Sequence, residues 1–307
     1  MKPLPRYMPR VSVIIPTHSR PSLLPRAVES AKAAGADVEV VVVDDASADE
    51  TGEVCRRLSG IRYVRVERNQ GTAGARNIGV LVSTAPYLAF LDDDDERLPD
   101  SLDRQIRALD EDPAAGMVYS RVLLVNHDGQ SLHPEPSDCP AGDVFWQLLE
   151  RNFMYPQSAL VRRECFLRVG LFKSAIAGID EWDLWVRIAE LYPVVFVDGP
   201  VSRYRLPHSA SDQLTTNLAA ELFVATARHQ LELFRLPRAA SAPADQRRLA
   251  RGRLLDLCSD KLLLGAREAL SDGSRKRAHK RILAALRLNP FRAARPLTFK
   301  LILESWL

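Results

Sequence analysis

A chain of 307 residues can bury one large core and a smaller appended one, and 46% hydrophobic with 26% charged residues is ordinary for a globular protein. The four cysteines are widely spaced and form no CxxC pair, which argues against a disulfide framework and a structural zinc site. The basic start of the chain has no apolar signal-peptide core, and no run of about eighteen apolar residues occurs, so we expect a cytoplasmic protein without a spanning helix.

Charge is divided unevenly along the chain. The net charge of +3 conceals 24 basic against 32 acidic residues up to position 227, followed by 18 basic against 7 acidic residues from Arg228 onward. Such a split predicts two parts with different tasks, and a basic part favours an anionic partner.

The first third of the chain alternates apolar runs with amphipathic segments. The pattern predicts strands at 11–15, 38–43, 61–66 and 87–91, and helices at 23–34, 51–58 and 75–82. This alternation is typical of a mostly parallel sheet covered on both faces. From about residue 220 the pattern is helical, with a hairpin predicted over 253–288. We therefore expect an α/β domain over 1–215 and a basic helical extension over 216–307.

Polar side chains follow three of the predicted strands. Pro16 and Thr17 follow the first, Asp44 and Asp45 the second, and four consecutive aspartates at 92–95 the fourth. In open α/β sheets, ligands bind beyond the carboxyl ends of the strands, so we expect these residues to share one site.

The two acidic segments each have two interpretations. A run of aspartates is often a solvated turn. At a buried sheet end, however, clustered carboxylates repel unless a cation neutralises them, and oxygen ligands suit Mg²⁺ or Mn²⁺, which could bridge two phosphates. Asp44 and Asp45 either satisfy a helix start or accept hydrogen bonds from a nucleobase or ribose. Neither GxGxxG nor GxxxxGK[ST] occurs, which disfavours dinucleotide and P-loop sites.

Two further segments combine a helix start with reactive side chains. The segment at 71–77 is either a glycine-rich connector or a helix start that brings Arg76 near a phosphate or the acidic cluster. The segment at 178–187 includes Asp180, Glu181 and Trp182 near its start. Acidic residues stabilise helix N-termini and tryptophans belong to cores, but a carboxylate general base beside an aromatic wall for a sugar ring is the functional alternative.

Taken together, these segments resemble family 2 glycosyltransferases, which have the GT-A fold. The matching segments occur in family order over about two thirds of the chain: VSVIIPT (11–17), VVVDDAS (41–47), NQGTAGARN (69–77), YLAFLDDDDERL (87–98), VGLF (169–172), DEWDLWVRI (180–188) and YRLPHSAS (204–211). Each motif is weak alone, whereas seven in order are specific.

The resemblance implies metal-assisted, inverting transfer of one sugar from a nucleoside diphosphate sugar to an acceptor hydroxyl. A UDP-sugar is the favoured donor, Mn²⁺ or Mg²⁺ the cofactor, and surface polysaccharide, glycolipid or natural-product glycosylation the expected setting. The donor site would be formed by Pro16, Thr17, Asp45, Arg76, Asn77, Asp92 and Asp93. Metal contacts would come from Asp94 first, with Asp92 and His208.

The resemblance also places the base and the acceptor at the helix start. The family usually has Glu-Asp before an aromatic residue, whereas this chain has Asp180-Glu181. The register gives Glu181 as the general base and leaves Asp180 as the alternative, with Trp182 in the acceptor site. The QxxRW element of processive synthases is absent.

Two other functions differ in class. A sugar nucleotidyltransferase would need a glycine-rich, arginine-containing loop after the first strand, where this chain has PTHSRP at 16–21. The second alternative is a degenerate transferase that serves as a binding or assembly module. The departure of residues 180–181 from the family pattern favours it, whereas the intact acidic cluster does not.

The basic end of the chain has its own expected partner. Residues 228–307 include RKRAHKR at 275–281 and an apolar end, LTFKLILESWL at 297–307. We expect peripheral contact with an anionic membrane or a charged acceptor carrier, not nucleic acid. A packing appendage with solvated basic faces is the alternative.

Overall fold

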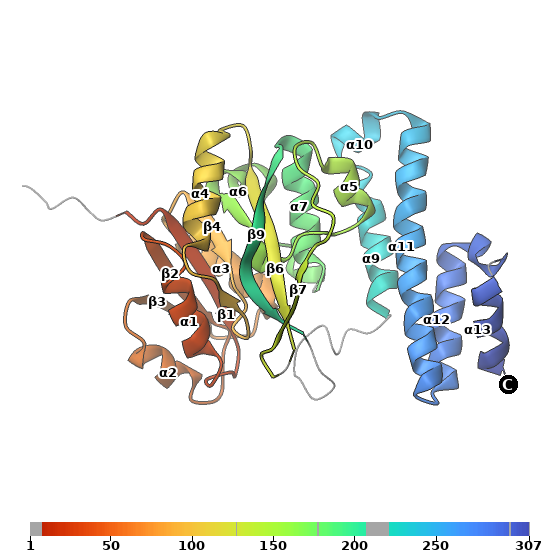
Figure 1. Cartoon of the computed structure of the whole chain (residues 1–307), viewed down its shortest axis with the longest axis horizontal. Helices are drawn as coiled ribbons and strands as arrows, with labels where there is room; N and C mark the ends of the chain where they lie inside the picture. Colours follow the sequence, from red (N-terminus) through yellow and green to blue (C-terminus); the bar gives the residue numbers. More distant parts are fainter. Residues whose placement is uncertain (1–7, 127, 177, 207–220, 295, 307) are drawn as a thin grey trace, which may run out of the picture. The chain divides into compact units, whose positions relative to one another are not determined.

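The computed structural model describes residues 8–126, 128–176, 178–206, 221–294 and 296–306, which divide into two compact units (Figure 1). Within these residues, the first unit comprises 8–144 and 153–206, and the second comprises 145–152 and 221–306. The boundary expected at 215 and 216 lies outside the described residues. The segment 145–152, which lies within the expected N-terminal domain, belongs to the second unit.

The first unit is built on one mixed sheet. Among the described residues it has nine strands in the order β3-β2-β1-β4-β8-β6-β9-β5, with β7 paired to β6. Strands β1 to β4 are parallel, and β8 is antiparallel to both β4 and β6. The strands are β1 (Val11–Thr17), β2 (Val38–Asp44), β3 (Ile61–Arg65), β4 (Tyr87–Phe90), β5 (Glu96–Arg97), β6 (Met117–Val125), β7 (Ser131–Glu135), β8 (Leu160–Arg162) and β9 (Val194–Arg205).

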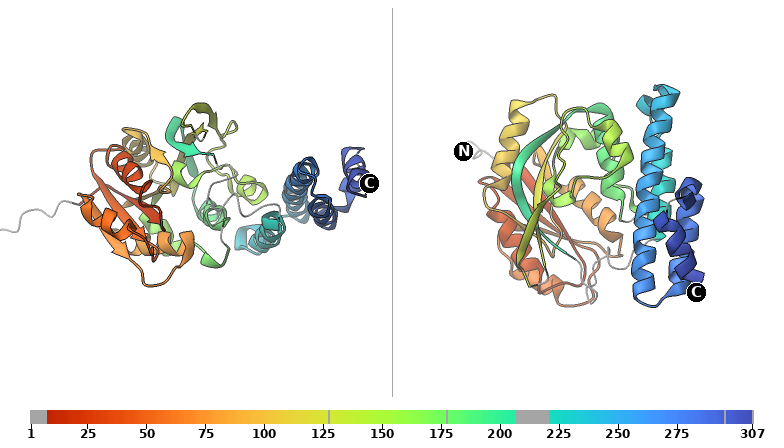
Figure 2. Two further views of the ribbon diagram at one scale, coloured as in Figure 1. Left: turned by 90° about the horizontal axis from the view of Figure 1, so that it is seen from below. Right: turned by 45° about the vertical axis from the view of Figure 1, so that its right-hand side comes forward.

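Helices cover both faces of this sheet (Figure 2). Val13 and Ile15 of β1 pack in one cluster with α1 (Leu24–Lys32) and α4 (Ser101–Glu111). On the opposite face, α3 (Gly71–Val82) packs so closely on β1 that a Cβ on Gly79 would lie 2.3 Å from Ile14 Cγ2. The remaining helices of the unit are α2 (Thr51–Arg57), α6 (Arg163–Val169) and α7 (Asp180–Leu191), with short 3-10 turns η1 (Pro156–Ser158) and η2 (Ser174–Ile176).

The predicted strands and helices of the first third are all present, with ends that differ by up to four residues; two of these differences have a clear physical reason. Strand β1 continues through Pro16 to Thr17; its pairing with β4 ends at Ile14, so the missing proline N–H leaves no gap in that ladder. Helix α3 begins at Gly71 instead of residue 75; burial of Ala73 in its first turn offsets the weak helix propensity of the two glycines.

The second unit is entirely helical in the described residues. The predicted hairpin is formed by α11 (Ala244–Ser271) and α12 (Arg275–Leu288), which turn at Gly273 with φ 75°. Leu262, Ala266 and Ile282 belong to its core. The other elements are α5 (Phe145–Glu150), α9 (Glu221–Leu233), α10 (Pro237–Ser241), η3 (Pro290–Ala294) and α13 (Pro296–Trp306).

Two further expectations concern covalent links and membrane spans. All four cysteines have free thiols. Helices in the described part of the chain are too short or too polar to span a bilayer.

Candidate active site

The polar residues that follow β1, β2 and β4 meet at one edge of the sheet. The register pairs Thr17 with Asp44 across β1 and β2, and Ile14 with Phe90 across β1 and β4. The Thr17 hydroxyl donates a hydrogen bond to Asp93 Oδ2 at 2.7 Å, and the Asp45 N–H donates to the Thr17 carbonyl at 2.8 Å. The predicted convergence of these strand ends is therefore confirmed.

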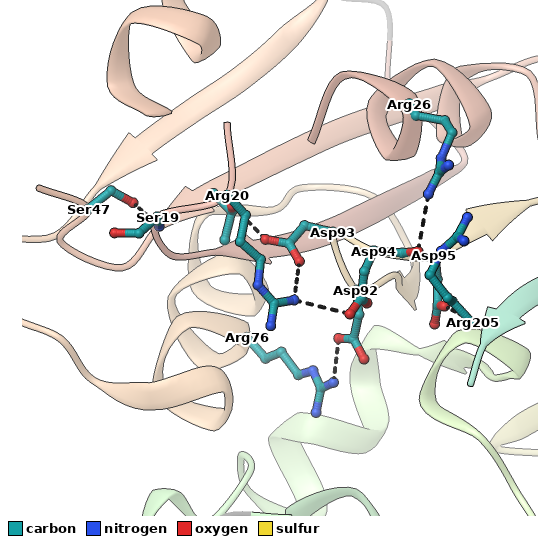
Figure 3. Close-up of polar contacts among 11 residues, drawn as sticks. Ser19, Arg20, Arg26, Ser47, Arg76, Asp92, Asp93, Asp94, Asp95 and Arg205 are labelled. Carbon is teal, nitrogen blue, oxygen red and sulfur yellow. Dashed lines mark hydrogen bonds and ion pairs between the residues drawn. The ribbon is translucent and has the colours of Figure 1, made fainter. Parts of the chain in front are cut away.

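The four aspartates form a tight turn whose carboxylates are held by three arginines and a glutamine, with Arg20 shared by Asp93 and Asp94 (Figure 3). The Asp95 N–H donates to the Asp92 carbonyl at 3.1 Å. Arg76 pairs with Asp92 at 2.7 Å, and one Arg20 nitrogen lies 2.9 Å from Asp93 and 3.1 Å from Asp94. The Asp95 carboxylate accepts hydrogen bonds at 2.8 Å from the Gln157 amide and from the Arg205 N–H.

Burial controls the charge of two of these carboxylates. It raises the pKa of Asp93 to about 6, against the opposing effects of Arg20 and Thr17. Burial also raises the pKa of Asp95 well above its usual range, helped by the charge of Asp94. Extra negative charge on this turn is therefore unfavourable, and an added cation would be stabilised there.

The two aspartates after β2 are held in different ways. Asp44 is fully buried and accepts hydrogen bonds from the Ser47 N–H at 2.9 Å and the Tyr63 hydroxyl at 2.7 Å, so it shapes the turn. One oxygen of Asp45 accepts the Gln70 N–H at 2.7 Å. Its other oxygen accepts no hydrogen bond from the described residues, and the residue as a whole is 3% exposed.

Arg76 connects the acidic turn to the start of α7. Its guanidinium is buried, with Nη2 at 2.7 Å from Asp92 Oδ1 and Nη1 at 3.3 Å from Asp180 Oδ2. Although burial opposes the charge, Asp92, Asp180 and Glu181 together raise the pKa of Arg76 above its ordinary value. One buried cation thus fixes the positions of two carboxylates from distant parts of the chain.

Asn77, the next residue on α3, braces the segment before α7. Its amide donates to the Phe172 carbonyl at 2.8 Å and accepts the Phe172 N–H at 2.9 Å. The Phe172 ring lies 5.8 Å below the Arg76 guanidinium carbon and 6.4 Å from the Trp185 ring. These contacts hold the first turn of α7 against α3.

The first two residues of α7, Asp180 and Glu181, differ in their burial and in their partners. Asp180 is buried in its ion pair with Arg76. Glu181 is partly exposed, and none of the described side chains donates a hydrogen bond to its carboxylate. Burial and the charge of Asp180 raise the pKa of Glu181 to about 7, while Arg76 opposes the shift. Glu181 can therefore accept a proton near neutral pH.

The aromatic and charged residues that follow are mostly part of the core. Trp182 is 6% exposed, so little of its ring is accessible. Asp183 is fully buried and pairs with Lys173 at 2.9 Å and Arg187 at 2.6 Å. Asp183 and its partners stabilise the α6–α7 corner.

The acidic turn offers the oxygen ligands that Mg²⁺ and Mn²⁺ prefer. Among the described residues, however, no three His, Cys, Asp or Glu side chains converge as a metal centre, and His208 lies outside them. Such a turn fits an ion that takes one or two carboxylates from the protein and its other ligands from phosphates and water.

The sequence analysis assigned no role at this edge to Gln157, nor to Arg20 and Tyr204, although these two stand in the quoted segments PTHSRP and YRLPHSAS. Arg20 lies three residues after Thr17, so its place in the loop after β1 was the available signal. Gln157 reaches Asp95 from η1, and Tyr204 lies on β9 with its ring 5.3 Å from Tyr155. These contacts depend on tertiary packing across long sequence separations.

Comparison with known proteins identifies the family of this architecture. The family model for glycosyl transferase family 2 matches residues 12–170. An uncharacterized glycosyltransferase of Rickettsia felis is 29% identical over 70% of this chain and 37% of its own length. Succinoglycan biosynthesis protein ExoO of Rhizobium meliloti is 38% identical over 41% of this chain and 36% of its own length. The matched region thus spans little more than a third of these two relatives.

Two solved structures share the fold. S. aureus TarS 1-349 in complex with UDP-GlcNAc has a TM-score of 0.61 at 16% identity, covering 96% of this chain and 88% of that one. The mannosyltransferase PcManGT from Pyrobaculum calidifontis, in complex with GDP-Man and Mn²⁺, has a TM-score of 0.59 at 20% identity, covering 98% and 85%. The expected GT-A fold is confirmed.

Proposed function

Because the chain belongs to glycosyltransferase family 2, we propose that it transfers one sugar from a nucleoside diphosphate sugar to an acceptor hydroxyl, with inversion at the anomeric carbon. The observation that carries this proposal is the link through Arg76 between the acidic turn and the start of α7. Through Asp180, this link would hold the neighbouring Glu181 carboxylate near the proposed diphosphate site.

The donor would bind across the edge of the sheet. The second carboxylate oxygen of Asp45 is suited to accept a hydrogen bond from the base, with Pro16 and Thr17 at the end of β1 beside it. UDP-GlcNAc in TarS and GDP-Man in PcManGT differ in their base, so uridine and guanosine donors are both candidates, with a UDP-sugar tried first.

Proton transfer would be the task of α7. Glu181 would remove the proton from the acceptor hydroxyl as that oxygen attacks the anomeric carbon. Asp180 would only help to position Glu181, because an oxygen of the Asp180 carboxylate is bound by Arg76. Trp182 stays the proposed acceptor contact.

The departing diphosphate would be neutralised at the acidic turn. Asp94 would be the direct ligand of a Mn²⁺ or Mg²⁺ ion, with Asp92 beside it and His208 as the third proposed contact. When bound, such an ion stabilises the negative charge of the leaving group. The PcManGT complex, which contains Mn²⁺, supports a divalent ion. Asp93 would shape the turn through its hydrogen bond from Thr17.

The similarity to ExoO favours an acceptor in surface polysaccharide assembly.

We also infer that the second unit contacts an anionic membrane or carrier. Three basic side chains, Lys276, Lys280 and Arg287, lie exposed along one stripe of α12. Phe291 of η3 is 87% exposed and Phe299 of α13 is 59% exposed, which is unusual for aromatic rings.

A donor screen tests the proposed reaction. The full chain is heated with UDP, GDP, dTDP, CDP and ADP sugars, with and without Mn²⁺, and the unfolding temperature is followed. The donor that stabilises the protein is then tested for release of its nucleoside diphosphate. Binding without any release, even with added acceptors, would favour the binding-module alternative. The absence of both would refute the proposed function.

A further inference from the structure

One arginine holds two carboxylates of the acidic turn together. The same nitrogen of Arg20, Nη1, lies 2.9 Å from Asp93 Oδ1 and 3.1 Å from Asp94 Oδ2 (Figure 3). The carboxylates are 6% and 11% exposed, whereas the Arg20 side chain is 25% exposed. A single positive group therefore bridges two adjacent carboxylates from the solvent side.

This bridge occupies an oxygen of Asp94 that a divalent ion would also use. Two buried carboxylates next to each other repel unless a cation lies between them. Arg20 supplies that cation, and Asp93 and Asp94 raise its pKa although burial opposes the charge. A metal ion on Asp94 would face the guanidinium at short range, and two cations sharing the same oxygens repel strongly.

The loop after β1 anchors the backbone of Arg20, so that only the conformation of its side chain can change. Ser19 has φ 54°, in the left-handed region, and its N–H donates to Ser47 Oγ at 2.8 Å. The Arg20 carbonyl accepts the Leu23 N–H at 3.3 Å at the approach to α1. The Arg20 backbone is thus anchored on both sides, so a rearrangement there would be confined to the side chain.

We propose that Arg20 is a donor-binding residue that bridges Asp93 and Asp94 until the metal-bound donor arrives, and then turns to the phosphates of that donor. A guanidinium can pair with phosphate oxygens through two parallel hydrogen bonds, which compensates for the carboxylates it leaves. The enzyme would then bind the ion and the diphosphate together, and the ion alone only weakly. This inference rests on the proposed donor site.

The test compares three variants of the full chain. Arg20→Gln removes the charge, and Arg20→Lys keeps it. Arg26→Gln is the matched control, because Arg26 contacts the Asp94 backbone carbonyl at 3.4 Å and the Glu96 carboxylate at 3.1 Å instead of the Asp93 and Asp94 carboxylates. Binding of Mn²⁺ alone is measured by electron paramagnetic resonance of the free ion. Binding of the nucleoside diphosphate with Mn²⁺ is measured by calorimetry.

Arg20→Gln should bind Mn²⁺ alone about tenfold more tightly than the wild type, the size expected when a charge-assisted hydrogen bond no longer competes. With Mn²⁺ present, the same variant should bind the nucleoside diphosphate about tenfold more weakly, because a phosphate contact is lost. Arg20→Lys should resemble the wild type in binding Mn²⁺ alone, and Arg26→Gln should resemble it in both measurements.

Unchanged Mn²⁺ affinity in a folded Arg20→Gln variant would overturn the proposal, and so would unchanged diphosphate affinity. A wild-type protein that binds none of the nucleoside diphosphates would instead refute the proposed donor site itself. The two failures are therefore distinguishable.

Discussion

Arg76 and Asp180 form a buried ion pair, with 3.3 Å between Nη1 and Oδ2, although they are 104 residues apart in the sequence. Because Arg76 also binds Asp92 at 2.7 Å, one guanidinium fixes the acidic turn relative to α7. Asp180 is committed to that cation, while the neighbouring Glu181 has no such partner in the described part of the chain. The roles of the two carboxylates follow from this difference.

Replacing Glu181 by glutamine should abolish transfer without loss of structure. The amide keeps the shape of the side chain but cannot accept a proton, so turnover should fall by about two to four orders of magnitude. Donor affinity and unfolding temperature should stay close to those of the wild type. Turnover of the identified donor and calorimetric binding of its nucleoside diphosphate are the two measurements.

Replacing Asp180 by asparagine should affect stability first. Removing one partner of a buried ion pair leaves Arg76 partly uncompensated, and such losses cost about 3 kcal/mol or more in free energy of unfolding. Urea unfolding measures this cost. If Asp180→Asn keeps its stability but loses turnover, while Glu181→Gln stays active, then Asp180 and not Glu181 is the general base.

The pH dependence of the reaction should show the raised pKa of Glu181. Burial and Asp180 raise this pKa to about 7, so the carboxyl group is protonated below that pH and cannot act as a base. We expect kcat/KM to fall about tenfold per unit as the pH drops below 7, and to reach its plateau above it.

Asp93 also titrates in this region, since burial raises its pKa to about 6. Binding of the intact nucleotide sugar over the same pH range separates Asp93 from Glu181, because binding does not require the base and the esterified diphosphate lacks the phosphate proton with a pKa of about 6. An acidic limb of kcat/KM near the ordinary glutamate pKa of about 4.3 would contradict the role given to Glu181.

The sequence alone predicts the parts of this site that depend on local pattern. Apolar runs located β1, β2 and β4, and the residues after them lie at one edge of the sheet because parallel strands share that edge. In contrast, Asn77 binds the Phe172 backbone 95 residues away, and Arg76 binds Asp180. Such partners are selected by tertiary contacts between α3 and the chain around residues 172–180, for which no local pattern exists.

The division of the chain shows the same limit. The composition changes near residue 220, which indicated a helical second part. Helix α5 belongs to that second unit although it lies between strands of the first, and Arg253 of α11 pairs with Glu150 at 3.0 Å. An insertion of this kind changes neither charge nor periodicity enough to be recognised.

Replacing Asp94 by asparagine should remove the dependence of donor binding on the metal. The neutral amide is a poor ligand for a hard divalent ion, so Mn²⁺ should no longer raise diphosphate affinity. Glu111→Gln, which removes an exposed carboxylate at the end of α4, is the control for overall charge. Titration of the nucleoside diphosphate with and without Mn²⁺ decides the question. An unchanged Mn²⁺ effect in the folded variant would exclude Asp94 as the ligand.

Binding of the second unit to anionic membranes should depend on both charge and exposed rings. Basic side chains near an anionic surface contribute about 1 kcal/mol each, so the Lys276, Lys280 and Arg287 stripe would contribute about 3 kcal/mol to reversible attachment and the exposed rings the remainder. The full chain should therefore sediment with vesicles that contain phosphatidylglycerol, and less so as salt increases. Replacing the three residues by glutamine should abolish sedimentation, and replacing Phe291 and Phe299 by serine should weaken it.

The control removes the same number of charges from the first unit. Arg56, Arg57 and Arg168 are exposed there, and their replacement by glutamine should leave sedimentation nearly unchanged. Equal loss in both triple variants would mean that only net charge matters, and that α12 is not the docking surface. Sedimentation that is absent at low salt, or indifferent to lipid charge, would remove the membrane as a partner. The basic helices would then be a packing appendage, since a bilayer is the anionic surface that can accept both the charges and the exposed rings.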